Sequence, residues 1–65
     1  MMYEFYFTRQ DFYPAAAFVQ ANIDVMVIAT SEDFARTRAH TISTSPPNGH
    51  TWRFILNSIV QLEDK

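Results

Sequence analysis

The sequence predicts an α+β fold, a small two-layer domain with the element order β-α-β-(short α)-β-β and a C-terminal hairpin. Three observations predict it: an alternating pattern opens the chain, an alanine-rich segment of helical spacing follows, and a β-branched run comes next. Aromatic residues make up 15% of the 65 residues. Because a chain this short can bury only one core, we expect residues 1–65 to form a single compact domain.

The first expected element is a strand. Tyr3, Phe5 and Phe7 alternate with Glu4, Tyr6 and Thr8. This period of two is typical of a strand with one buried face. We therefore expect a strand that ends near Thr8, with Tyr6 on its outer face.

A helix is expected over about Asp11–Ala21. Thr8 and Asp11 form a capping pair in sequence, Pro14 suits a first helical turn, and three alanines follow. At helical spacing one face would carry Phe12, Ala15, Ala16, Val19 and Ile23. Tyr13 and Phe18 fall to either side of that face.

The segment Ile23–Ala29 is expected to be the central strand. It is β-branched and, from Val25 onward, apolar at consecutive positions, which is typical of a strand covered on both faces. The preceding helix is long enough for a crossover, so a parallel pairing with the first strand is predicted, and an antiparallel pairing stays open as the alternative.

A second, short helix is expected after this strand. Thr30 or Ser31 can cap it, and Glu32 and Asp33 supply the acidic residues that a helix N-terminus favours. Phe34 is the expected anchor of this helix in the core.

The last expected element is a hairpin of Thr41–Thr44 with Thr51–Leu56. The intervening Ser45–His50 contains Asn48-Gly49, a strong turn signal. The final segment fits two patterns, because alternation and helical spacing both account for its apolar residues. We favour a strand through Asn57, and a helix is the alternative.

Composition and charge narrow the class of protein. The chain has no cysteine, no basic region followed by an apolar stretch at its start, and no apolar run longer than Val25–Ala29. We therefore expect no disulfide, no signal peptide, no membrane contact and a cytoplasmic location. Charge is polarised: residues 10–33 carry four acidic and no basic residues, and residues 34–62 carry three arginines and no acidic residue.

The residues that carry chemistry do not form a known catalytic or cofactor pattern. Gly49 is the single glycine, which excludes glycine-rich phosphate loops. His40 and His50 lack a second ligand at helical spacing, so we expect His40 in a strand, His50 in a turn, and no metal. Glu32 and Asp33 are adjacent and would point about 100° apart on a helix, which suits capping better than acid–base work. We expect neither an enzyme nor a cofactor.

Protein binding is the expected function. Several aromatic residues lie off the main apolar faces, and acidic residues lie near them in sequence, so together they would form a patch with an apolar centre and a charged rim. The expected protein-binding residues are Tyr6, Tyr13, Phe18, Asp11, Asp24, Glu32 and Asp33. By analogy of size alone, such a domain would act as an inhibitor or adaptor of a larger protein complex. Phage-encoded inhibitors of bacterial defence, anti-CRISPR proteins among them, are of this size class. Antitoxins of the same size class are an alternative.

Weak nucleic-acid binding is the other alternative. Arg36, Arg38, Arg53 and Trp52 would have to converge on one side of the hairpin, together with His40. Three arginines neutralise few phosphates, so nucleic acid is the less favoured partner. A homodimer also stays open, because an unpaired edge strand such as Tyr3–Thr8 would recruit another edge.

Overall fold

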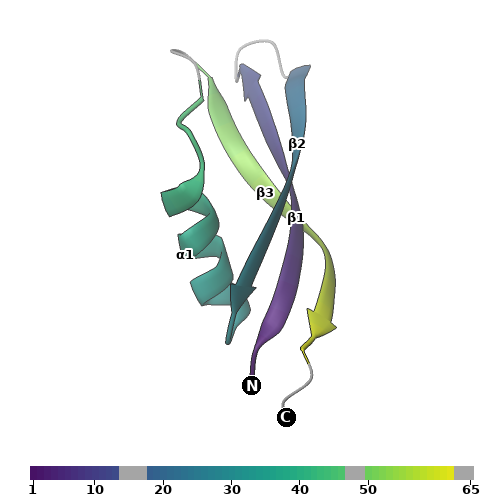
Figure 1. Ribbon diagram of the computed structural model, residues 1–65. Helices are drawn as coiled ribbons and strands as arrows, with labels where there is room; N and C mark the ends of the chain where they lie inside the picture. Colours follow the sequence, from purple (N-terminus) through teal and green to yellow (C-terminus); the bar gives the residue numbers. More distant parts are fainter. Residues whose placement is uncertain (14–17, 47–49, 63–65) are drawn as a thin grey trace.

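The structure is a three-stranded antiparallel sheet with one helix packed on one of its faces (Figure 1). The computed structural model describes residues 1–13, 18–46 and 50–62, and of residues 13 and 18–20 it describes the backbone only. The elements are β1 (Tyr3–Tyr13), β2 (Phe18–Ala29), α1 (Glu32–Ile42) and β3 (Thr51–Gln61). The α+β class is therefore confirmed, with the order β-β-α-β.

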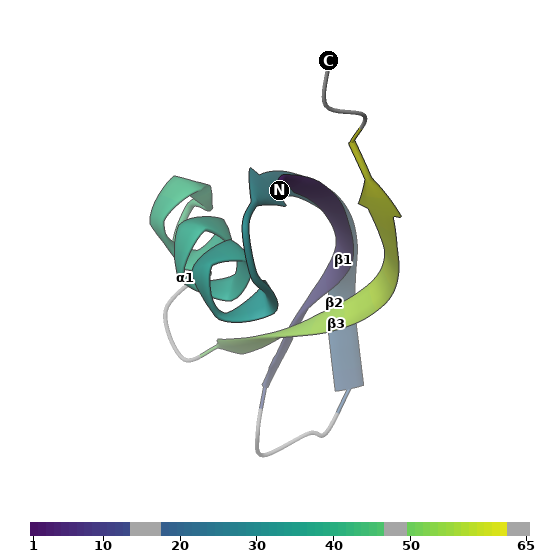
Figure 2. The same ribbon diagram turned by 90° about the horizontal axis from the view of Figure 1, so that it is seen from below.

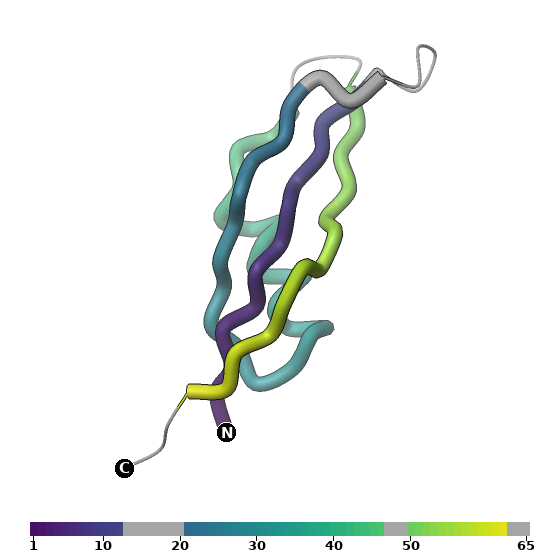
Figure 3. The backbone as a smooth tube through the Cα atoms, turned by 90° about the vertical axis from the view of Figure 1, so that its right-hand side faces the viewer, coloured from purple at the N-terminus to yellow at the C-terminus, as the bar shows by residue number. Residues whose placement is uncertain are grey.

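The first strand of the chain lies in the middle of the sheet, in the order β2-β1-β3 (Figure 3). Along β2 the register runs unbroken from Tyr3 opposite Ala29 to Asp11 opposite Ala21. Along β3 a bulge interrupts the register, because Tyr6 pairs with Ser58 and the next residue, Phe7, pairs with Leu56. Both outer strands are antiparallel to β1.

The core lies between α1 and the face of the sheet that α1 covers (Figure 2). Ala35 and Ala39 of α1 are fully buried, because their small side chains let the helix backbone approach the sheet closely. Three Phe rings of the sheet meet them. Phe7 stacks with Phe5 at 6.4 Å between ring centroids and meets Phe54 edge to face at 6.1 Å. Val27 and Ala29 complete this core.

The helix begins where the sequence indicates but is longer than expected. Ser31 is the N-cap, and its Oγ accepts a hydrogen bond from the Phe34 N–H at 3.3 Å. Glu32 and Asp33 occupy the first turn, as expected. The expected anchor was wrong: Phe34 is 67% exposed, and the two alanines anchor α1 instead. No helix of the described residues is long and apolar enough to span a membrane.

The expected helix over Asp11–Ala21 was wrong. β1 continues to Tyr13, β2 begins at Phe18, and these two residues pair directly; residues 14–17 lie outside the described part of the chain. The strand pattern was hidden because Arg9 and Asp11 occupy inward positions where an apolar residue is expected. Pairing in the sheet overrides the helix propensity of the alanine-rich segment at both of its ends.

The expected arrangement of strands was also wrong. Residues 23–29 belong to an edge strand, not the central one, and this strand is antiparallel to β1. Thr41 and Ile42 end α1 and form no hairpin, while β3 pairs with β1. Asn48 and Gly49 lie outside the described residues. The strand interpretation of the last segment is confirmed, and β3 extends past Asn57 to Gln61.

Candidate functional site

The face of the sheet opposite α1 is the candidate site. Side chains alternate along β1, so Glu4, Tyr6, Thr8 and Gln10 point away from the helix. Their partners on the neighbouring strands share that face. Within the described part of the chain no helix or strand covers it (Figure 3). We call it the open face.

One end of the open face is polar and satisfies its own hydrogen bonds. Arg53 Nε donates to Gln10 Oε1 at 2.8 Å, and Gln10 Nε2 donates to Asn22 Oδ1 at 3.0 Å, so one chain of contacts crosses all three strands. Beside it, Asn57 Nδ2 donates to Thr8 Oγ1 at 2.7 Å. Two apolar residues lie among these groups: Ile55, the partner of Thr8, is 40% exposed, and the Arg53 guanidinium lies 5.5 Å from the centre of the Phe12 ring. The rest of this end is the solvated polar surface that an antiparallel sheet commonly has.

The other end of the open face is apolar. Two rows of cross-strand partners lie here: Ile28, Glu4 and Val60 in one, and Met26, Tyr6 and Ser58 in the next. Four of these six side chains are large and apolar, with exposed fractions of 38% for Ile28, 46% for Val60, 44% for Met26 and 37% for Tyr6. We call these four residues the apolar end. A contiguous group of this kind marks an interaction surface more often than scattered single residues do.

Acidic groups border the apolar end. Glu4 lies between Ile28 and Val60, and Asp24 lies next to Met26 along the same face of β2. The Tyr6 hydroxyl donates to Glu4 Oε1 at 2.9 Å, and this hydrogen bond to a carboxylate raises the pKa of Tyr6 above its ordinary value. A hollow of about 420 Å³ is lined by Tyr6, Met26, Asp24 and Ser58, among others. The apolar end can therefore receive apolar side chains from a partner that carries basic groups around them.

The structure brings two of the expected protein-binding residues together, Tyr6 and Asp24. Glu32 and Asp33 lie in the first turn of α1, where Glu32 Oε2 accepts a hydrogen bond from Arg36 Nε at 2.8 Å. The side chains of Tyr13 and Phe18 lie outside the described part of the chain.

The structure places Asp11 in the interior, so its expected role on a surface rim is corrected. Arg9 Nε donates to Asp11 Oδ1 at 2.7 Å and Arg9 Nη2 to Oδ2 at 3.0 Å, while the side chains are 6% and 8% exposed. The Arg9 guanidinium also lies 4.2 Å from the centre of the Trp52 ring. Asp11 neutralises a buried cation and is not available to a partner.

The residues of the nucleic-acid alternative do not converge. Arg53 lies on the open face, and its neighbour Trp52 faces the helix side, half-buried between Arg9 and the His40 ring, whose centre is 5.1 Å away. Arg36 is held on α1, where Nη1 donates to the Phe54 carbonyl at 2.8 Å, and Arg38 is exposed on another part of α1. His40 belongs to α1, not to a strand as expected.

Sequence reasoning missed Met26, Ile28 and Val60. The signal was present, because residues 25–29 are apolar at consecutive positions and so on both faces of the strand. It was interpreted as a central strand covered on both sides, whereas the elements of the described residues cover one side only. The outward-facing apolar residues of an edge strand then remain for a partner to cover.

Comparison with known proteins gives no assignment: no family model, no curated protein and no solved structure matches the chain. Among the described residues, no group of three or more His, Asp or Glu side chains is placed to hold a metal ion.

Proposed function

We propose that the protein is a non-enzymatic protein-binding module that inhibits or adapts a larger protein complex and docks on it through the apolar end of the open face. The observation that supports this proposal is the combination of four large, exposed apolar side chains on adjacent strands of a sheet face that α1 does not cover. Covering such a surface removes apolar area from water, which favours association.

The charges around the apolar end indicate the chemistry of the partner. Glu4 and Asp24 are acidic, and the nearest basic residue on the open face, Arg53, lies at the polar end, where Gln10 accepts its hydrogen bond. The matching surface is therefore a protein with an apolar centre and Lys or Arg at its rim. By analogy of size, an inhibitor of a defence complex of the anti-CRISPR kind is the biological role we propose.

The test compares four tagged proteins, the wild type and three variants, in affinity capture from the native lysate. Met26→Lys and Val60→Lys place a charge in the apolar end, and both positions are exposed, so both variants should unfold at close to the wild-type temperature. Ile42→Lys is the matched control, because Ile42 is an equally large, exposed aliphatic residue at the end of α1.

The proposal expects one stoichiometric protein that the wild type and Ile42→Lys retain and that the two open-face variants lose, with affinity lower by about 30-fold. A protein that all four chains capture equally would contradict it. Capture of nucleic acid alone, lost after nuclease treatment, would also contradict it, as would self-association of the wild type that Val60→Lys abolishes.

A further inference from the structure

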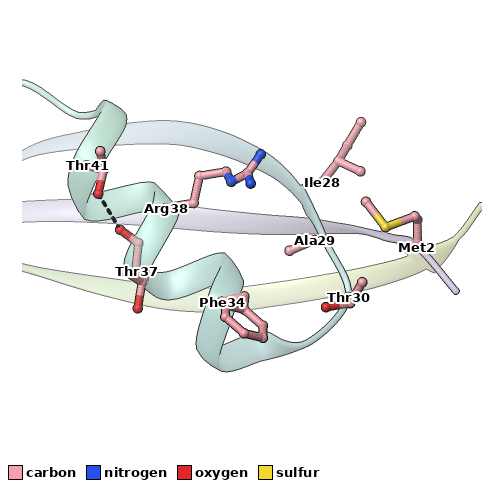
Figure 4. A pocket seen from close by; sticks show the side chains of 8 residues that line it. All are labelled: Met2, Ile28, Ala29, Thr30, Phe34, Thr37, Arg38 and Thr41. Carbon is pink, nitrogen blue, oxygen red and sulfur yellow. Dashed lines mark hydrogen bonds between the residues drawn. The ribbon is translucent and has the colours of Figure 1, made fainter.

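A second surface lies between α1 and the outer edge of β2. A hollow of about 410 Å³ opens there (Figure 4). Four residues of α1 form one wall, namely Phe34, Thr37, Arg38 and Thr41, and Ile28 and Met2 lie on the opposite side. We call this hollow the edge groove.

The strand beside the edge groove has an unpaired outer edge. β2 is the first strand of the sheet order, so its outer N–H and C=O groups pair with no strand of the described residues. From Ala21 to Ala29 it follows β1 without a bulge, and this stretch contains no proline and no lysine. Strands with these features are templates for the addition of another strand, because natural edges are usually blunted by bulges, proline or lysine.

The wall formed by α1 is an exposed side of the helix. Phe34, Thr37, Arg38 and Thr41 have the spacing i, i+3, i+4 and i+7, so they share one side of the helix. This side is not the one that carries the buried Ala35 and Ala39. All four residues are exposed, and Phe34 is the most exposed large apolar residue whose side chain the structure describes. A strand added to the edge of β2 would lie next to this side of α1 and cover it.

The charge of the edge groove specifies what such a strand carries. Arg9 and Arg36 each form an ion pair, whereas Arg38 forms none with the described residues, and it extends toward Ile28 (Figure 4). Among the residues that the structure describes, the lining of the groove contains this one cation and no carboxylate. Its complement is an anionic side chain.

We propose that the edge groove binds an extended segment of a partner protein, which adds to β2 as a fourth strand and places an Asp or Glu side chain against Arg38. Main-chain hydrogen bonds to β2 supply the affinity of this mode of recognition, and side chains at alternate positions supply the specificity. A second copy of this chain fits less well. A two-fold interface uses the same patch on both copies, and the described lining of this groove offers no carboxylate to the Arg38 of the other copy.

The groove is a site distinct from the apolar end, although Ile28 borders both. The test therefore changes residues that belong to one surface only. Random heptapeptides displayed on phage are selected against the wild type, Arg38→Glu and Arg53→Glu. The last variant is the matched control, because Arg53 is an exposed arginine on the open face.

The wild type and Arg53→Glu should select alternating β-branched sequences with one Asp or Glu at a fixed position, and Arg38→Glu should select Lys or Arg there. The synthetic form of the selected peptide should bind Arg38→Glu about fivefold more weakly than the wild type, the size of effect that an exposed ion pair has. Exchange of its acidic residue for Lys should reverse that order. Amide NMR shifts should change along residues 21–29 and α1.

The proposal would be overturned if none of the three proteins enriched any peptide sequence, or if Arg38→Glu selected the same charge in the peptide as the wild type does. It would also be overturned if the peptide changed the amide NMR shifts only of Glu4, Tyr6 and their neighbours on the open face. A wild-type dimer whose amide shifts map to β2 and which Arg38→Glu leaves intact would also overturn it, because the second copy would then be the occupant.

Discussion

Replacing Asp11 by alanine removes one half of the buried ion pair with Arg9. The two hydrogen bonds of 2.7 and 3.0 Å disappear, and the guanidinium of Arg9, whose side chain is 6% exposed, keeps the face of Trp52 as its partner among the described residues. Removing one member of such a pair costs about 3–5 kcal/mol, because a buried charge is left without compensation. A chain of 65 residues has a total stability of roughly 3–10 kcal/mol, so Asp11→Ala should lose about a third of it or more.

The double variant Arg9→Met, Asp11→Leu separates the cost of an unpaired charge from the value of the pair. It removes both charges and fills their space with apolar groups, so its free energy of unfolding should lie within about 2 kcal/mol of the wild type. The double variant should therefore be more stable than Asp11→Ala, although it changes one more residue.

Urea unfolding measures these differences, with Trp52 fluorescence and far-UV circular dichroism as two probes. Trp52 is the single tryptophan and contacts Arg9, so its emission reports the site directly. If Asp11→Ala cost less than about 1 kcal/mol, or if the double variant were the less stable of the two, the reasoning that the buried charge dominates would be refuted.

Two further predictions concern the helix contact and the open face. Ala39→Leu should lower the free energy of unfolding by about 1–3 kcal/mol, because a fully buried alanine has no room for a larger side chain. Thr37→Leu, on the exposed side of α1, should change this free energy little. Urea unfolding measures both variants, and equal effects would contradict the packing of α1 on the sheet. The raised pKa of Tyr6 predicts that its phenol titrates above pH 10 in the folded protein and that Glu4→Gln lowers this pKa. The stability that the Tyr6 hydrogen bond contributes is fully present below pH 10 and is lost as the pH rises through the raised pKa. NMR titration of the Tyr6 ring and unfolding at several alkaline pH values measure the pKa and the loss of stability. An unchanged Tyr6 pKa in Glu4→Gln would exclude the hydrogen bond as the cause of the shift.

The sequence predicted the elements whose signals are local. The cap at Ser31, the acidic first turn and the alternation in the first strand depend on neighbouring residues only, and the structure contains all three. The strand over Asp11–Tyr13 was missed because its inward charge is compensated by Arg9, two residues earlier. In sequence such a pair cannot be distinguished from two solvated surface charges.

The candidate site was predicted in part for a related reason. Tyr6 and Asp24 were expected because an aromatic or acidic residue off the apolar face stands out. Met26, Ile28 and Val60 look like core residues, and only the number of layers in the fold decides whether a strand face is covered. That number depends on where α1 packs, which local patterns do not determine.

The position of β1 in the middle of the sheet also has a consequence for the order of folding. During synthesis β1 can pair with β2 as soon as residue 29 is free, because Tyr13 and Phe18 are close in sequence. The other edge of β1 stays unpaired until β3 has been synthesised. The contact between Thr8 and Asn57 joins residues that are 49 positions apart in sequence. Contacts of such long range form slowly. The nascent hairpin therefore presents two open edges until β3 docks, and pairing with a neighbouring chain competes with folding during that interval.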